Sequence, residues 1–402
     1  MTETITPYSY SRTGPCPFDP APELLETARP VRKVRTWGGH TSWLVTGYDE
    51  LRIALADPRL SADARRPGFP HLTPVTRDTM PRTPSLTTMD GPEHAARRRM
   101  LTKYFAVKRV ERLRPRVQHL VDDLVDSMLD AGNTADLYRD LALPVPSLVI
   151  CDLLGVPYED HDFFQRTTRV MVSSTSTGEE TRSATREITA YLDRLVAAKQ
   201  DRPGDDLISG LCAEQGAQGL LSREQIADAA SFLLFAGHET TANMIALSTA
   251  ALFAYPAQHT LLRDAPDTEA VAGAVEELLR YLSIVQTGRR RIATQELELG
   301  GEQIKASDGV ILALDAANRD PRAFGHYADT LDLHRPSRHH VAFGFGVHQC
   351  LGQPLARMEL QVVHATLHRR IPTLAPAIPL DRIRFKQDSF VYGVHELPVT
   401  WQ

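Results

Sequence analysis

The feature that most constrains the fold is a long stretch without proline, which runs from Ser222 to the residue before Pro256. Ser222 is followed three residues later by Gln225, and this spacing is typical of a capping box, in which two side chains satisfy free backbone N–H groups where a helix begins. A helix over the whole stretch would be about 48 Å long at 1.5 Å per residue. The sequence therefore predicts a helix long enough to cross a domain.

Hydrophobic periodicity predicts that much of the remaining chain is helical too. Apolar residues recur at spacings of three and four within 117–129, 188–196, 226–252 and 271–282. An early hairpin is predicted, in which Gly38 and Gly39 separate 31–37 from 40–46. Further strands are predicted at 289–293, 310–314 and 390–399. We expect one domain over residues 1–402, mainly α with a smaller β-rich lobe (α+β), and this lobe is contributed mainly by 31–60, 288–315 and 380–400.

Composition excludes several classes of protein. With 42% hydrophobic and 24% charged residues, the chain has the profile of an ordinary globular protein. Residues 1–11 lack the pattern of a secretory signal, and no segment has the roughly 20 apolar residues of a membrane helix. Four cysteines in 402 residues do not form a disulfide framework, and the net charge of -5 argues against nucleic acid. We expect a cytoplasmic monomer that binds neither nucleic acid nor a membrane.

Residues 61–90 differ from the rest of the chain because they are rich in proline. Proline removes a backbone donor and clashes with the preceding turn, so no long helix is expected in this segment. A lid or binding loop is the favoured interpretation of such a segment, and a mobile connection is the alternative. The prolines are Pro67, Pro70, Pro74, Pro81 and Pro84.

The most informative motif is Phe343-Gly-Phe-Gly346-Val-His348-Gln-Cys350-Leu-Gly352. Two of its glycines closely flank the cysteine. Gly346 can adopt positive φ and so permit a tight loop, and Gly352 lets a flat ligand or another backbone approach closely. The motif therefore predicts a tight loop that contains the cysteine.

A helix is predicted over 351–369, with Pro354 tolerated in its first turn. Cys350 would then lie where backbone N–H groups and the positive end of the helix dipole favour a thiolate over a thiol. A thiolate is a candidate nucleophile or a candidate metal ligand. On the loop alone, these two roles and a structural cysteine remain open alternatives.

The motif resembles the haem-binding loop of the cytochrome P-450 family, in which Phe, Gly, His or Arg, Cys and Gly occupy the same spacing. In that family the cysteine thiolate is the proximal ligand of the haem iron. The resemblance extends over the whole chain. It implies the P-450 fold and a haem b cofactor (iron protoporphyrin IX) whose iron is ligated by Cys350. We expect the remaining cysteines to be structural; these are Cys16, Cys151 and Cys212.

The middle of the long helix places polar groups where a core is expected. The apolar run 232–235 leads directly into Ala-Gly-His-Glu239-Thr240-Thr, and Gly237 costs about 1 kcal/mol relative to alanine in a helix. A zinc-protease helix is excluded because its second histidine would fall at Ala242. The segment resembles the oxygen-activating helix of the same family, which implies that Glu239 and Thr240 relay protons.

Two further sets of residues fit the resemblance. Glu277 and Arg280 share one helical face, and the family pairs this Glu-x-x-Arg with an arginine before the cysteine loop, for which Arg335 is the candidate. We expect this trio to stabilise the fold. A haem also brings two propionates, which need cationic donors. The resemblance assigns this role to His94, Arg98, Arg291 and His348.

Residues 97–116 contain nine Lys or Arg and one acid, Glu111. From charge alone, a solvated helix face is the favoured interpretation. In the family the same helix lies on the cysteine side of the haem, where an acidic ferredoxin docks. The resemblance therefore implies a docking face that includes Arg97, Arg99, Lys103, Arg109 and Arg112.

The sequence thus predicts a haem-thiolate monooxygenase that hydroxylates or epoxidises an apolar organic substrate. It would use dioxygen and electrons from NAD(P)H through a ferredoxin reductase and ferredoxin. Three alternatives are a haem-thiolate sensor without catalysis, a cysteine hydrolase using Cys350 and His348, and a peroxide-driven relative, against which the Glu239-Thr240 pair argues. The substrate is expected to be a polyketide, macrocycle or terpenoid, in secondary metabolism or xenobiotic turnover. Four residues share one helix face and should line its binding wall: Phe232, Phe235, Ala236 and Thr240. The resemblance implies that Val285 and Val391 complete this wall.

Overall fold

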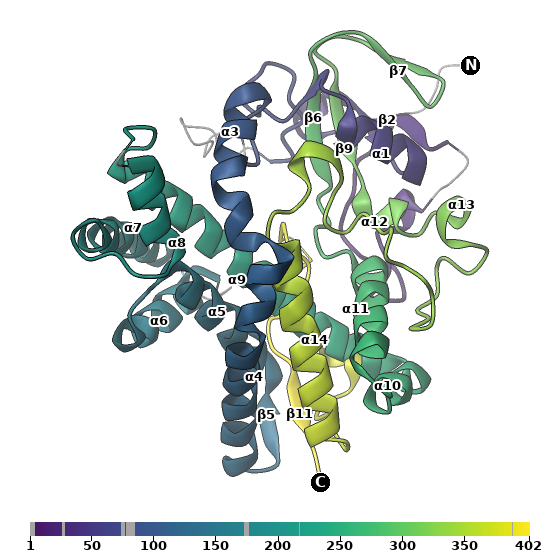
Figure 1. The fold of residues 1–402 in the computed structure, drawn as a ribbon. Coiled ribbons are helices and arrows are strands. Elements are labelled where there is room, and N and C mark those ends of the chain that lie inside the picture. The colour runs from purple at the N-terminus through teal and green to yellow at the C-terminus, as the bar shows by residue number, and fades with distance from the viewer. Residues whose placement is uncertain are drawn as a thin grey trace. The chain divides into compact units, whose positions relative to one another are not determined.

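The computed structural model describes residues 5–25, 29–73, 77, 85–172, 177–216, 218–387 and 389–402. The chain divides into two compact units, each assembled from three separate stretches of sequence (Figure 1). Unit 1 comprises Met1–Leu101, Glu269–Gln353 and Lys386–Tyr392, and unit 2 comprises Thr102–Thr268, Pro354–Phe385 and Gly393–Gln402. The two units are interleaved along the chain, so no single cut in the sequence separates them.

Unit 1 contains a six-stranded sheet in the order β1-β2-β3-β9-β6-β4. The predicted early hairpin is confirmed, because β2 (Val31–Arg35) pairs antiparallel with β3 (Thr41–Val45) around Gly38 and Gly39, which have φ of 76° and 79°. A separate two-stranded hairpin is formed by β7 and β8. The other strands of this unit are β1 (Thr6–Pro7), β4 (Leu60–Ser61), β6 (Arg289–Ala293), β7 (Leu297–Leu299), β8 (Glu302–Ile304) and β9 (Gly309–Leu312).

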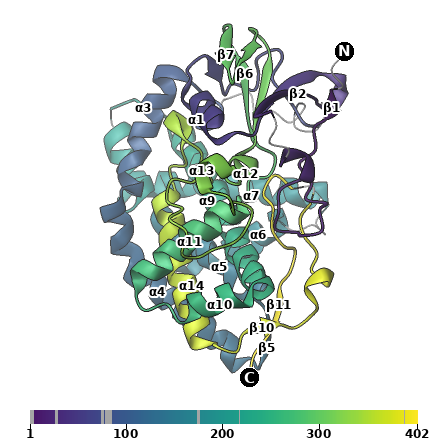
Figure 2. The same cartoon turned by 90° about the vertical axis from the view of Figure 1, so that its right-hand side faces the viewer.

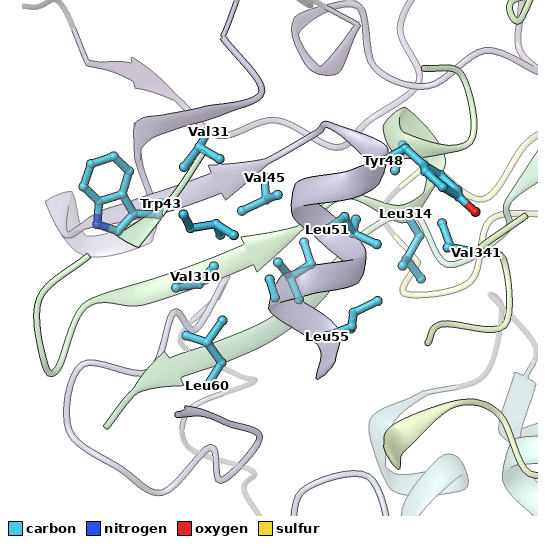
Figure 3. Close-up of a cluster of buried hydrophobic side chains, with 14 of the residues drawn as sticks. Val31, Trp43, Val45, Tyr48, Leu51, Leu55, Leu60, Val310, Leu314 and Val341 are labelled. Atoms are coloured by element: carbon cyan, nitrogen blue, oxygen red, sulfur yellow. The ribbon is translucent and has the colours of Figure 1, made fainter. Parts of the chain in front are cut away.

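Helix α1 (Tyr48–Ala56) packs on this sheet and forms the core shown in Figure 3. Leu51 and Leu55 of the helix belong to the same buried cluster as Trp43 and Val310 of the strands. Complete burial of a side chain of this size contributes about 1.5–3 kcal/mol. The sheet and α1 therefore give unit 1 a hydrophobic core of its own.

The predicted brace is also present in unit 1. Arg280 on α11 (Thr268–Leu282) donates from Nε and Nη2 to the two oxygens of Glu277, both at 2.7 Å, and Arg335 Nε lies 3.3 Å from Glu277 Oε1. Glu277 and Arg280 are completely buried. The trio is thus an internal ion-pair cluster, as expected. The other helices of this unit are α3 (Gly91–Thr102), α12 (Leu314–Ala317) and α13 (Pro321–Phe324).

Unit 2 is helical and contains the predicted long helix as α9 (Arg223–Ala254). Ser222 accepts from the backbone of Gln225 and the Gln225 side chain accepts from residue 222, so the capping box is confirmed. The helices α4 and α14 run side by side in Figure 1, where Gln118 Nε2 donates to Thr366 Oγ1 at 2.8 Å. The other helices are α4 (Val107–Asp130), α5 (Pro144–Leu154), α6 (His161–Val172), α7 (Gly178–Asp201), α8 (Leu207–Leu211), α10 (Pro256–Arg263) and α14 (Gln353–Arg370).

A small sheet lies beside the C-terminus in unit 2 (Figure 2). Its order is β10 (Ala375–Pro376), β11 (Pro398–Thr400) and β5 (Thr134–Asp136). The strand expected at 390–399 is shorter, because residue 391 bridges Val285, residue 394 bridges Phe385, and only β11 continues as a strand. Residues 390–399 therefore pair with different segments along their length and do not form one continuous strand.

The fold is mainly helical with a smaller β part, so the predicted fold class is confirmed. Within the described ranges, every helix is too short or too polar to cross a lipid bilayer. Much of the proline-rich segment 61–90, including Pro74, Pro81 and Pro84, lies outside the described residues. Its described residues 61–73 and 85–90 contain turns and no helix, and residue 77 is helical. The lid interpretation thus stays a prediction.

Candidate active site

The cysteine loop in unit 1 is fixed by backbone hydrogen bonds. The N–H of Cys350 donates to Phe343 O at 2.8 Å, and the N–H of Gln349 donates to Gly346 O at 3.0 Å. Gly346 has φ of 71°, and a Cβ there would lie 2.8 Å from Leu55 O. A side chain at this position would therefore be strained and would also clash with the backbone of α1, so the predicted need for glycine is confirmed.

Gly352 is less constrained by the protein. A Cβ at this position would meet no described atom within 4 Å. Close approach by another backbone is therefore not the reason for glycine here, and approach by a flat ligand stays a prediction. Cys350 itself is half-buried and lies three residues before the first residue of α14. Its position before a helix start favours an anionic side chain.

The predicted propionate ligands gather around this loop in unit 1. Arg98 Nη2 donates to Gln349 O at 2.6 Å, which ties α3 to the residue before the cysteine. The rings of His94 and His348 have centroids 4.2 Å apart. Arg291 is buried on β6 and acts electrostatically on His94. The structure therefore brings all four predicted residues together.

His94 provides a direct test of whether the site suits an anionic cofactor. It is buried, and its Nε2 has no hydrogen-bond partner among the described residues. Burial and then the neighbouring cationic groups lower its pKa to about 4, so the ring is neutral at pH 7 and retains one N–H donor. Burial also lowers the pKa of Arg291, to about 10, which leaves the guanidinium charged. A neutral donor beside buried guanidinium groups fits the carboxylates of a haem.

Two residues of this site were not predicted from the sequence. Asp90 accepts hydrogen bonds from Ser61 Oγ at 2.5 Å and the backbone of Ala62 at 3.1 Å, and its Oδ1 lies 3.2 Å from His348 Nε2. Burial alone would raise the pKa of Asp90, but these hydrogen bonds outweigh it and hold the pKa well below its usual range. The second residue is Arg289, which precedes Arg291 by two positions and was detectable from strand alternation.

Helix α9 of unit 2 carries the predicted proton-relay pair. Thr240 Oγ1 donates to Ala236 O at 2.8 Å, and Asn243 Nδ2 donates to Glu239 O at 2.8 Å. Glu239 is half-buried and acts electrostatically on Tyr138, whose pKa is raised first by burial and then by this carboxylate. The pair therefore lies in a partly enclosed environment within the helix.

The same helix shows the face that was expected to bind substrate. Phe235 is 41% exposed and Ala236 is exposed, whereas Leu233 and Leu234 beside them are buried. A Cβ at Gly237 would lie 3.6 Å from Ile150, an ordinary contact, so packing does not require glycine there. The expected face thus combines apolar side chains with incomplete burial; its members are Phe232, Phe235, Ala236 and Thr240.

The other predicted site residues lie as follows. In unit 1, Val285 and Val391 form an isolated β-bridge and both are buried. Cys151 and Cys212 of unit 2 are buried, and burial raises the pKa of both thiols, which suits a structural role. Cys16 is half-buried.

The predicted docking cations differ in their contacts. Arg97 pairs with Glu93 at 3.0 Å in unit 1, where Arg99 is exposed. In unit 2, Arg112 is exposed, and the remaining two cations each pair with an acid. These ion pairs are Lys103 with Glu214 and Arg109 with Asp205.

Comparisons with known proteins agree with this geometry. The family model described as Cytochrome P450 matches residues 34–371. Cytochrome P450-SU2 of Streptomyces griseolus is 53% identical over 393 residues, which cover 97% of this chain and 96% of that protein. Vitamin D3 dihydroxylase of the same organism is 44% identical and covers 96% of this chain and 95% of its own. The crystal structure of cytochrome P450 MoxA from Nonomuraea recticatena has a TM-score of 0.93 at 47% identity and covers 98% of both chains.

Proposed function

The chain belongs to the cytochrome P450 family of oxygen-incorporating oxidoreductases, and from this premise we propose that it is a haem-thiolate monooxygenase that hydroxylates or epoxidises a large apolar organic substrate. Electrons would come from NAD(P)H through a ferredoxin reductase and a ferredoxin. The observation that carries the proposal is the Cys350 loop, with its fixed backbone and its surrounding cationic and N–H donors.

The residues of unit 1 would hold haem b. Cys350 would ligate the iron, and the propionates would be bound by His94, Arg98, Arg291 and His348. When bound, a haem with a thiolate ligand supplies the chemistry that activates dioxygen. Asp90 would orient His348, since a carboxylate that accepts from one ring nitrogen fixes which nitrogen carries the proton.

Protons would be managed by α9. The Thr240 hydroxyl donates its hydrogen to Ala236 O. Its oxygen lone pairs therefore remain able to accept a hydrogen bond from a proton donor. Glu239 would supply and regain protons from its half-buried position. Positioned acid–base groups of this kind typically contribute about 10²–10⁴ to a rate.

The substrate would be bound by apolar side chains. The candidates in unit 2 are Phe232, Phe235 and Ala236 of α9, and the candidates in unit 1 are Val285 and Val391. We propose a polyketide, macrocycle or terpenoid as the substrate, and the relative named Vitamin D3 dihydroxylase supports a large apolar compound. We also propose a monomeric cytoplasmic enzyme. The cations that would contact its ferredoxin are Arg97, Arg99, Lys103, Arg109 and Arg112, and this association should weaken as salt rises.

The decisive experiment is the carbon monoxide difference spectrum of the reduced protein. We expect the wild type to give the spectrum of a thiolate-ligated haem and Cys350→Ala to lose it together with turnover. Cys16→Ala, which removes a half-buried cysteine outside the loop, should retain both. Purified protein without a Soret band would contradict the proposal and favour a cysteine hydrolase.

Turnover separates an enzyme from a sensor. NADH consumption accompanied by an oxygenated organic product is expected in the wild type with a ferredoxin and its reductase. Thr240→Ala should lower product formation by about 10²-fold or more while NADH oxidation falls less. Haem binding with no product for any ligand that shifts the spin state would instead support a sensor.

A further inference from the structure

Strand β6 contains three consecutive arginines whose side chains divide between two faces. The strand pairs antiparallel with β9, with Arg289 opposite Leu312 and Arg291 opposite Val310. Because side chains alternate along a strand, Arg289 shares the face of Arg291, and Arg290 points to the other face. The Arg290 guanidinium accordingly lies over the ring of Phe69, 5.8 Å from its centroid.

The backbone that leads into β6 fixes where Arg289 is placed. Gly288 has φ of 70°, and a Cβ there would lie 2.9 Å from Leu312 O. The chain can enter the strand by this path only with glycine. Arg289 is therefore held in position by the sheet and not by a flexible loop.

Arg289 has an unusual electrostatic environment. It is half-buried, and among the described residues the one acidic group that acts on its pKa is the Cys350 thiol. Arg289 and Arg291 are close enough for Arg289 to lower the pKa of Arg291. The two guanidinium groups therefore belong to one face of β6, and Asp90, the carboxylate that acts on Arg291, already accepts hydrogen bonds from Ser61 and Ala62.

Among the described residues, the site holds three guanidinium groups, on Arg98, Arg289 and Arg291, and one carboxylate, Asp90, which lies 3.2 Å from His348 Nε2 and accepts from Ser61 and Ala62. A haem brings two propionates, for which Arg98 and Arg291 are available, with His94 as an additional N–H donor. The cysteine thiolate would be neutralised by the iron. Arg289, on which Asp90 does not act, would then remain a half-buried guanidinium without a carboxylate partner in the described part of the chain, and a ligand can supply one.

We propose that Arg289 determines specificity by binding a carboxylate at one end of an otherwise apolar substrate. The inference rests on the proposed function and deepens it, since it names the chemical class of the substrate. The segment that leads to Arg289 also supplies Val285 of the apolar wall and the Thr287 hydroxyl, which is buried without a partner among the described residues. A guanidinium and a hydroxyl two residues apart along the chain are both donors that suit an acid group, and the valine suits the apolar body.

The test compares apolar carboxylic acids with their methyl esters. Three scaffolds would be used: a linear C12 chain, a bicyclic terpenoid and an aryl-alkyl chain. Binding to the haem-loaded protein would be measured by the spin-state shift and by calorimetry. The variants are Arg289→Met, which keeps the length without the charge, and Arg289→Lys, which keeps the charge without the planar donors. Arg290→Met is the matched control on the opposite face.

We expect the wild type to bind the acid at least about tenfold more tightly than the ester on one or more scaffolds. Arg289→Met should weaken acid binding by about tenfold to a hundredfold and leave ester binding unchanged. Arg289→Lys should retain part of the preference, and Arg290→Met all of it.

Two results would overturn the inference. One is that no scaffold shows a preference for the acid. The other is that Arg289→Met accelerates haem loss and leaves the ratio of acid to ester binding unchanged, which would make Arg289 a propionate ligand. Either result can occur in a protein with the normal carbon monoxide spectrum, whereas failure of the proposed function would remove that spectrum altogether.

Discussion

The buried ionisable groups near the Cys350 loop of unit 1 differ in charge from a buried group of histidines in unit 2. Around the Cys350 loop of unit 1, guanidinium groups remain charged and several are close together. Between α9, α10 and α14 of unit 2, Ser248, His364, His368 and His259 form a hydrogen-bonded chain with distances of 2.8, 3.3 and 3.0 Å. Burial lowers the pKa of all three histidines, to about 4 for His364.

The histidine chain satisfies itself without a ligand. Ser248 Oγ lies 2.6 Å from Met244 O, to which it donates, so it accepts from His364 Nε2. His364 Nδ1 then accepts from His368, and His368 Nδ1 accepts from His259. Every ring is neutral and partnered. Burial alone therefore does not mark a ligand site, whereas a buried donor without a partner among the described residues, such as His94 Nε2, does.

The largest expected effect comes from a third case, in which buried charges pair with one another inside the protein. Glu277→Gln would leave Arg280 and Arg335 without their carboxylate inside unit 1. We expect the free energy of unfolding to fall by about 3–5 kcal/mol, measured by urea denaturation, because removal of one partner leaves a buried charge. Glu269→Gln, at an exposed position on α11, should change it by less than about 0.5 kcal/mol. Equal effects of the two variants would contradict the role of the brace.

Protonation of the buried His364 should make the stability of the protein depend on pH. Since the pKa of His364 is about 4 in the folded chain and about 6.5 in the unfolded one, the unfolded chain binds more protons between these values. Stability should therefore fall as pH drops from 6.5 to 4, by about 3 kcal/mol for this residue. Urea denaturation of the wild type and of His364→Gln at several pH values in this range measures how steeply the free energy of unfolding depends on pH in each protein.

Glu359 makes that comparison of slopes necessary. Burial raises its pKa to about 8, so its contribution to the free energy of unfolding is lost as pH rises from about 4.5 to 8. This pH dependence is opposite in sign to that of the histidines. Because Glu359 is common to both proteins, its contribution cancels. His334→Gln, which replaces an exposed histidine, should keep the wild-type slope. If the free energy of unfolding of His364→Gln depended on pH as steeply as that of the wild type, the buried histidines would not be held neutral in the folded protein.

Local signals explain which parts of the structure the sequence predicted. The capping box at Ser222 and the proline at 256 gave both ends of α9, and β6 has the predicted bounds. The spacing around Cys350 predicted a loop whose shape depends on one glycine. In each case the information lies within a few residues, where propensity, caps and turn chemistry act directly.

Contacts between distant segments could not be predicted in this way. Asp90 meets His348 across 258 residues, and Ser248 meets His364 across 116. No local pattern links such pairs, because tertiary packing alone brings them together. Arg289 is intermediate: alternation predicts its face, but its lack of a carboxylate partner is visible only when the neighbouring elements are in place.

The third prediction tests whether the cations of unit 1 serve a ligand. Arg98→Ala should accelerate transfer of haem to an acceptor apoprotein by about tenfold to a hundredfold, because a charge-assisted hydrogen bond contributes about 1.5–3 kcal/mol. Arg97→Ala removes a neighbouring cation that already has Glu93 as a partner, and haem transfer should stay at the wild-type rate. Equal rates in Arg98→Ala and the wild type would place Arg98 among the structural groups.

The smallest expected effect concerns how unit 2 holds its proton-relay residues. Ser222→Ala removes the hydroxyl that accepts from Gln225 at the start of α9 and should lower stability by about 1 kcal/mol. Glu239 lies more than four helical turns further along, where the buried middle of the helix and not its cap fixes the backbone. At equal haem loading, product formation should thus be unchanged, and Ser222→Asp should restore the stability. A loss of turnover without a loss of stability would mean that the cap positions Glu239, and the separation between structural and chemical roles within α9 would not hold.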